Sequence, residues 1–145
     1  MDRKKDINNK GFSFIEVLVV STIIAVLTAV GVSNFRVANQ KSRDGKRQGD
    51  LEQIKAALEL YRTDQNDYPT TGEWPGTGGT LLVGGTTYMG QIPSDPVDDY
   101  DYDYSSDGFT YTLCAALELD TSGTCTGSPN CATGVPCNYE INNPL

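Results

Sequence analysis

The stretch KGFSFIEVLVVSTIIAVLTAVGV, residues 10–32, sets the architecture expected for this chain. Within it, residues 12–32 form a run of 21 in which Glu16 is the one charged side chain. A helix of that length spans roughly 30 Å, the thickness of a bilayer's hydrocarbon core. Four basic residues precede the run: Arg3, Lys4, Lys5 and Lys10. The pattern predicts a single membrane-spanning helix near the N-terminus.

The length of the apolar run and the charge of Glu16 distinguish this segment from a secretory signal peptide and from a plain membrane anchor. A secretory signal peptide has a shorter apolar region of roughly 7–15 residues. A plain membrane anchor has no need of a carboxylate, which is unfavourable in hydrocarbon and therefore indicates a functional partner. If the chain is cut between Gly11 and Phe12, Phe12 gains an α-ammonium group one helical turn before Glu16. The same amine on a neighbouring copy can neutralise Glu16 and fix the register of a stack.

Residues 10–20, KGFSFIEVLVV, resemble the class III signal peptide of type IV pilins and type II secretion pseudopilins. The resemblance implies that a prepilin peptidase cuts after Gly11, that the amine of Phe12 is methylated, and that Glu16 acts in assembly. It also implies the α+β pilin fold, a long N-terminal helix packed on a small antiparallel sheet with a disulfide-rich tail.

The helical pattern continues past the membrane segment. Leu51, Ile54, Leu58 and Tyr61 recur at spacings of three, four and three, which marks one helix face ending near Asp64. Residues 57–70, ALELYRTDQNDYPT, resemble the helix end and first loop of the major pseudopilin of type II secretion. The expected organisation is a leader (1–11), a transmembrane or filament-core helix (12–32), an amphipathic continuation (33–66), a helix-to-sheet loop (67–87) and an antiparallel β domain with a Cys-rich tail (88–145).

Alternating residues in the last third predict a β-hairpin. Tyr100, Tyr102 and Tyr104 alternate with aspartates, and an Asp-Gly turn follows. The second strand places five apolar residues on one face: Phe109, Tyr111, Leu113, Ala115 and Leu117. Residues 138–142 can add a third strand, and the apolar helix face at Leu51–Tyr61 can cover the sheet.

The four cysteines favour disulfides. They are Cys114, Cys125, Cys131 and Cys137, and none of them forms a C-x-x-C pair of the kind that holds zinc. An even number of cysteines in a small extracytoplasmic domain predicts two disulfides rather than a zinc site or free thiols. The spacing leaves three pairings open.

Charge is strongly segregated along the chain. Of 11 Lys+Arg and 19 Asp+Glu, every base lies at or before Arg62, and 12 acids follow Thr63. With a net charge of −8 and no His, nucleic-acid binding by the whole chain and His-dependent catalysis are disfavoured. No nucleophile–base set indicates an enzyme.

Two charged clusters admit competing interpretations. The basic cluster comprises Arg36, Lys41, Arg43, Lys46 and Arg47, and is expected either to be a solvated helix face near lipid headgroups or to pair with the acidic domain of a neighbouring subunit. Major pseudopilins bind calcium in a sheet-side loop, which suggests a calcium site at Asp95, Asp98 and Asp99. The alternative is a solvated acidic edge that discourages aggregation. No other cofactor is expected.

These features predict a non-enzymatic subunit of a type IV pilus or type II secretion pseudopilus. Its expected partners are other copies of itself, a prepilin peptidase, an inner-membrane assembly platform, and membrane lipid before assembly. The predicted location is a single-pass membrane protein that later joins an extracytoplasmic or cell-surface filament. The alternative is a membrane-anchored extracytoplasmic binding module that never polymerises. The sequence leaves open whether the system serves adhesion, secretion or DNA uptake.

Overall fold

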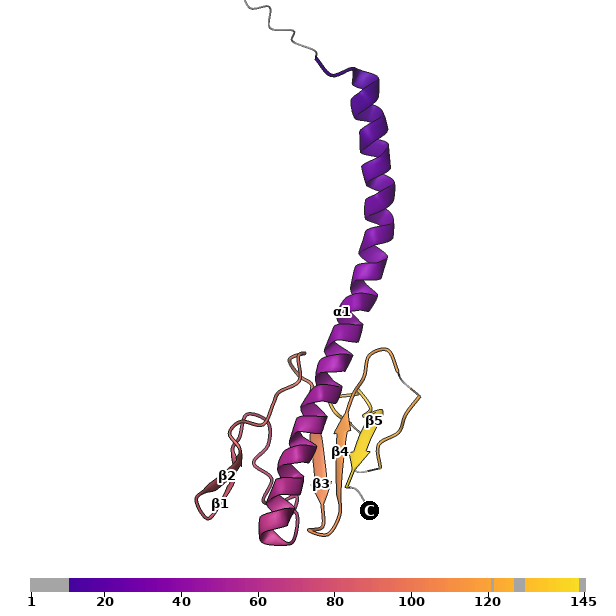
Figure 1. The fold of residues 1–145 in the computed structure, drawn as a ribbon. Coiled ribbons are helices and arrows are strands. Elements are labelled where there is room, and N and C mark those ends of the chain that lie inside the picture. The colour runs from indigo at the N-terminus through magenta and orange to yellow at the C-terminus, as the bar shows by residue number, and fades with distance from the viewer. Residues whose placement is uncertain (1–10, 121, 127–129, 144–145) are drawn as a thin grey trace, which may run out of the picture. The chain divides into compact units, whose positions relative to one another are not determined.

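A computed structural model describes residues 11–120, 122–126 and 130–143 of this chain. Its contacts divide the chain into two units, Met1–Ala38 and Asn39–Leu145. One helix, α1 (Phe14–Gln65), runs through both units (Figure 1). Of the leader expected at residues 1–11, only Gly11 falls within the described residues.

Local hydrogen bonds define both ends of α1. The carbonyl oxygen of Ser13 accepts the backbone amides of Glu16 and Val17 at 3.0 and 3.3 Å. At the other end, Asn66 adopts a φ of 68° and its amide donates to the carbonyl of Arg62 at 2.8 Å. A left-handed residue after the last turn is a common helix stop. The helix therefore ends within one residue of the end predicted at Asp64.

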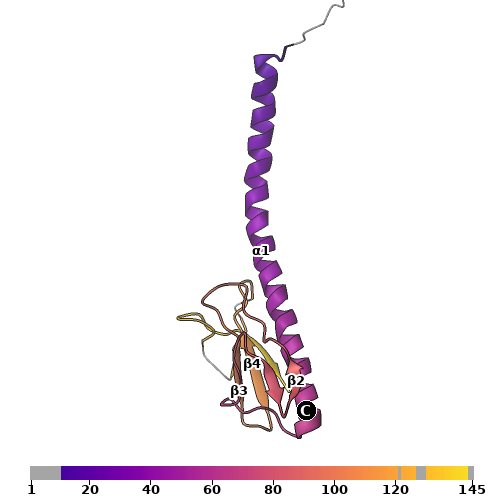
Figure 2. The same ribbon diagram turned by 90° about the vertical axis from the view of Figure 1, so that its left-hand side faces the viewer.

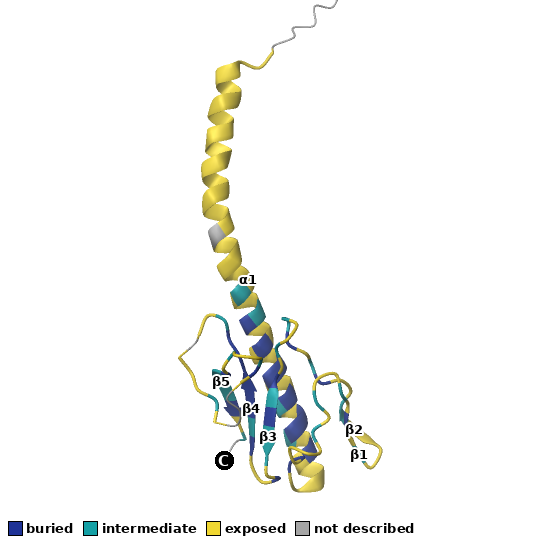
Figure 3. Cartoon of the chain, turned by 180° about the vertical axis from the view of Figure 1, so that it is seen from behind, coloured by how far each residue is buried: buried dark blue, intermediate teal, exposed yellow. Residues whose placement is uncertain are grey.

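The first unit is an exposed apolar helix. Its most apolar 18-residue window has a mean hydropathy of 2.4, and none of that window is buried within the chain. Figure 3 shows this part of α1 as exposed along its described length. By length and composition it can cross a membrane.

Within its described residues, the second unit contains two small antiparallel sheets. The larger one orders its strands β3 (Asp103–Ser106), β4 (Tyr111–Ala115) and β5 (Tyr139–Asn142), with β4 in the centre. Tyr104 pairs with Leu113, and Leu113 pairs with Ile141. This sheet lies along the second half of α1 (Figures 1 and 2). The α+β fold predicted from the sequence is confirmed, including the third strand.

The core lies between α1 and the larger sheet. Leu51, Ile54 and Leu58 are fully buried in one cluster with Leu113 and Tyr111. The helix face recognised by its spacing is thus the face that covers the sheet, which Figure 3 shows in dark blue. Burial of these apolar side chains is the main favourable contribution to folding of this unit.

The segment expected to be a loop, residues 67–87, instead contains part of a hairpin. β1 (Leu81–Val83) pairs with β2 (Thr86–Met89) across Gly84 and Gly85. These glycines have φ values of 57° and 88°, which a tight two-residue hairpin turn requires. Trp74 packs within the chain, with its ring stacked 4.3 Å from that of Tyr104.

Phe109 also differs from expectation. The alternation placed it on the inward face, yet its side chain is 81% exposed. β4 begins only at Tyr111, because residues 107–110 form the turn after β3. The period-two pattern therefore holds from Tyr111 onward and does not extend into the turn.

Candidate functional site

The first candidate site lies at the start of the N-terminal unit. Phe12 is 83% exposed and precedes the helix, whereas Glu16 lies in its first turn. Both side chains line one apolar groove that also includes Val20 and Ile24. Among the described residues, no cation forms an ion pair with Glu16. The structure thus places Phe12, the predicted methylation site, and Glu16, the predicted assembly residue, in one groove.

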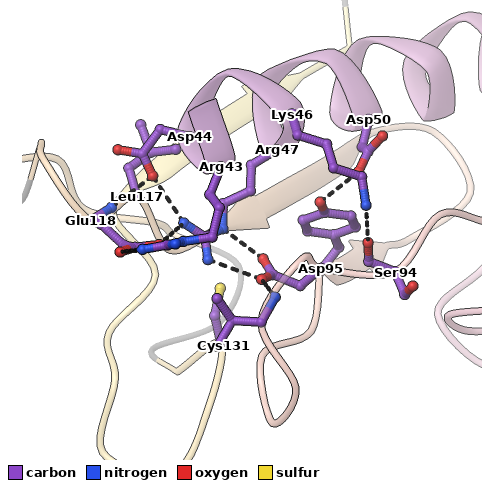
Figure 4. Close-up of polar contacts among 12 residues, drawn as sticks. Arg43, Asp44, Lys46, Arg47, Asp50, Ser94, Asp95, Leu117, Glu118 and Cys131 are labelled. Carbon is purple, nitrogen blue, oxygen red and sulfur yellow. Dashed lines mark hydrogen bonds and ion pairs between the residues drawn. The ribbon is translucent and has the colours of Figure 1, made fainter. Parts of the chain in front are cut away.

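A second cluster centres on Arg47 in the other unit (Figure 4). The Arg47 side chain is fully buried, and its Nε and Nη2 donate to the two carboxylate oxygens of Asp95 at 2.7 and 2.9 Å. Its Nη1 donates to Asp44 at 2.9 Å and to Glu118 at 3.0 Å. The guanidinium also lies 5.4 Å from the ring centre of Tyr100. One arginine on α1 therefore holds the loop before β3 and the loop after β4.

Hydrogen bonding favours the ionised forms of Arg47 and Glu118. Burial alone would lower the pKa of Arg47, but its hydrogen bonds to Asp95 and Glu118 outweigh that effect and raise it. Hydrogen bonds from Arg43, together with Arg47, lower the pKa of Glu118 to about 2 against the opposing effect of burial. Arg43 contacts Glu118 through two bonds of 2.6 Å. Each buried charge in the cluster thus has a partner of opposite sign.

This cluster settles part of the question posed by the basic residues. Arg43 and Arg47 pair with acids of their own chain, whereas the sequence predicted either a solvated face or pairing with a neighbouring subunit. Lys46 donates to the carbonyl of Ser94 at 3.2 Å and lies 3.9 Å from Asp50. Arg36 and Lys41 are exposed and have no ion-pair partner in the part of the chain that the structure describes.

The acidic partners Asp44 and Glu118 were not predicted from the sequence. Asp44 also accepts the backbone amides of Glu118 and Leu119 at 2.9 and 3.0 Å. The sequence does contain a pattern that indicates this cluster. Asp44, Arg47 and Leu51 are spaced by three and four residues, so Asp44 and Arg47 continue the buried helix face toward the N-terminus. A charged pair in phase with an apolar helix face indicates a buried ion pair.

The predicted calcium ligands do not gather at one point. Both oxygens of Asp95 are taken by Arg47, and one of them also accepts the amide of Val97 at 2.8 Å. Asp98 and Asp99 are exposed, and two carboxylates fall short of the six to eight oxygens that calcium prefers. The set as predicted does not fit calcium while Asp95 is paired with Arg47. Calcium binding at Asp95, Asp98 and Asp99 stays a prediction.

The cysteines form two disulfides, Cys114–Cys125 and Cys131–Cys137. The expectation of disulfides is confirmed, and the structure selects one of the three possible pairings. Glu140 lies close to the first pair. Because Cys114 and Cys125 are bonded to each other, that group offers no thiolate to a metal ion.

Comparisons with known proteins agree with these features. Residues 7–32 match the family model of the prokaryotic N-terminal methylation motif. The chain is 31% identical over 121 residues to the type II secretion system core protein G of Vibrio cholerae, covering 76% of this chain and 80% of that protein. The same-named proteins of Pectobacterium carotovorum and Escherichia coli are 31% and 30% identical, covering 63% and 60% of this chain. These two matches span 56% and 66% of those relatives' own lengths. No solved structure matches significantly.

A membrane-length N-terminal helix that continues into a small disulfide-linked α+β unit defines the pilin and pseudopilin class. The match of residues 7–32 to the N-terminal methylation motif supports the same class. Within that class, the chain belongs to the type II secretion system core protein G family, the major pseudopilins.

Proposed function

We propose that this chain is the repeating, non-enzymatic subunit of an extracytoplasmic filament of a type II secretion system. The observation that carries the proposal is Glu16, a carboxylate in an apolar helix that has no cationic partner among the described residues and shares a groove with Phe12. Membership of the core protein G family supports the same function.

Cleavage of the leader supplies a cationic partner for Glu16. A prepilin peptidase cuts between Gly11 and Phe12, and the new amine of Phe12 is methylated. That ammonium group lies at the N-terminal end of a helix, where the helix dipole already carries partial positive charge. The carboxylate of Glu16 on a neighbouring copy stabilises it there.

Assembly transfers the apolar helix from lipid to other helices. An inner-membrane platform extracts the processed subunit, and the helices pack as the filament core. Lipid tails and helix faces are similarly apolar, so hydrophobicity alone gives little preference for the filament. Pairing of Glu16 with the amine of the adjacent subunit therefore supplies the register.

The experiment compares Glu16→Gln with Glu52→Gln in cells that carry the assembly machinery. Glu52 is an exposed acid on the other unit, so its variant controls for loss of one negative charge. We expect Glu16→Gln to insert into the membrane normally and to reduce the yield of sheared filaments at least tenfold, with Glu52→Gln unaffected. Equal filament yields from Glu16→Gln and the parent chain would contradict the proposal. A tethered binding module, by contrast, is unaffected by the loss of this charge.

A further inference from the structure

The turn between β3 and β4 leaves the aromatic side chain of Phe109 exposed on the surface of the second unit. Phe109 is 81% exposed, although the sheet beside it is well packed. Oδ1 of Asp107 accepts the amides of Phe109 and Thr110 at 2.9 and 2.8 Å, and Gly108 supplies a φ of 91°. These constraints fix the turn in advance, so little conformational freedom would be lost when Phe109 binds a partner.

The turn lies beside the C-terminal end of α1 (Figure 1). The backbone amide of Tyr68 donates to the carbonyl of Gly108 at 2.8 Å, which joins the turn to the residues that follow the helix. Asp67 adds an exposed carboxylate there, close in sequence to Tyr68. We call Asp67, Asp107 and Phe109 the tip.

A pocket lies at the other end of the same unit. Its volume is about 330 Å³, and its lining includes Gln40, Tyr100, Leu117, Glu118, Val135 and Pro136. A benzyl side chain fits within that volume. Lys41, next to the lining residue Gln40, is exposed and has no ion-pair partner among the described residues. We call the residues that line this pocket the entry pocket.

The tip and the entry pocket cannot meet within one chain. Residues 40 and 66 are separated by 26 residues of helix, or about 39 Å along its axis. They can meet only between copies. A contact between two different surfaces of identical subunits is heterologous, and it propagates as an open helical array when its rotation does not close into a ring. The carboxylate of Glu118 in the pocket lining is already paired with Arg43 and Arg47. The ammonium group of Lys41, next to the lining residue Gln40, is opposite in charge to the carboxylates of the tip, which favours this pairing.

We propose that Phe109 of one subunit inserts into the entry pocket of a second copy further along the filament. The inference rests on the proposed filament function. It assigns a second contact to the outer units, in addition to the contact between helices. Gln40 lies two residues after the end of the N-terminal unit at Ala38, so the pocket is close in sequence to the segment proposed to form the filament core.

The test places a photoreactive residue at the tip in the full chain, as Phe109→p-benzoylphenylalanine, and irradiates assembled filaments. A matched control carries the same residue at Leu82, an exposed apolar position on β1. We expect cross-linked dimers whose peptides join position 109 to residues 116–118 or 135–138 of another copy, with none of these products from position 82. Phe109→Ser should shorten filaments at least threefold, whereas Leu82→Ser should leave their length unchanged.

Other outcomes overturn the inference. They are cross-links from position 109 to a different protein, cross-links to other parts of this chain, or full-length filaments from Phe109→Ser. If the unaltered chain forms no filaments at all in the same cells, the filament function itself fails. If filaments form without the cross-link, only the contact of Phe109 fails.

Discussion

Glu16 lies in the apolar run of α1, and Arg47 lies on the buried face of the same helix. Arg47 is surrounded by Asp44, Asp95 and Glu118, so its charge is balanced within the chain. Glu16 has no such partner among the described residues. A buried charge is tolerated when it is paired and hydrogen-bonded, and an unpaired one indicates a partner that has still to be supplied. The first residue stabilises the folded unit, whereas the second is proposed to serve assembly.

Replacing Arg47 tests the buried cluster. Arg47→Met should lower the free energy of unfolding by about 3–5 kcal/mol, because Asp95 is left buried without its cation. The measurement is urea unfolding of the detergent-solubilised chain, followed by fluorescence of Trp74, the single tryptophan. Lys46→Met, whose side chain is 51% exposed, is the control and should change the value by less than about 0.5 kcal/mol. Equal effects of the two variants would show that the cluster contributes little.

Glu118 predicts a dependence of stability on pH. Its pKa is lowered from 4.5 to about 2 in the folded chain by Arg43 and Arg47. Its stabilising contribution is therefore complete above pH 4.5 and is lost as the pH falls toward 2. Allowing for solvent screening at the partly exposed Arg43, this amounts to about 2 kcal/mol. The difference in unfolding free energy between the parent chain and Glu118→Gln should shrink by that amount across this window. A constant difference would contradict the assignment.

At the scale of helices and strands, periodicity predicted the elements that are both regular and buried. Leu51, Ile54 and Leu58 revealed the helix face, and the alternating tyrosines revealed the β3–β4 hairpin. The β1–β2 hairpin escaped prediction because its strands are short and lie in a Gly- and Thr-rich segment that reads as a loop. The Arg47 cluster escaped because two of its acidic partners, Asp95 and Glu118, are distant in sequence, and only Asp44 lies near Arg47 on the helix. Disulfide pairing also depends on tertiary placement, which cysteine spacing does not specify.

The disulfide Cys131–Cys137 should stabilise the segment between β4 and β5. It closes a loop with a sequence separation of 6, and the loss of chain entropy in the unfolded state predicts about 2 kcal/mol. A Cys131→Ala/Cys137→Ala variant should therefore unfold at lower urea concentration than the parent chain under non-reducing conditions. In excess reductant the two chains should differ much less. If the two chains differ in their unfolding urea concentration by the same amount in both conditions, the cysteine side chains contribute through packing and not through the cross-link.

The whole molecule combines two units with different physical requirements. The first exposes a continuous apolar helix and needs lipid or other helices around it. The second has its own core and two disulfides, and residues 39–145 carry 16 acids against 6 bases. Filaments that bring such units together must offset their mutual repulsion through contacts between copies. Because unpaired charges repel less at high ionic strength, salt should affect contacts between the outer units more than packing of the helices.

Mass spectrometry of filaments sheared from cells tests the central claim most directly. The account predicts a chain that begins at Phe12 and carries one added methyl group on its α-amine. The residues before Phe12 should be absent from the assembled material and present only in the membrane-bound precursor. Recovery of a chain that retains Gly11 and the residues before it, or recovery only as dispersed single molecules in the envelope, would contradict the account.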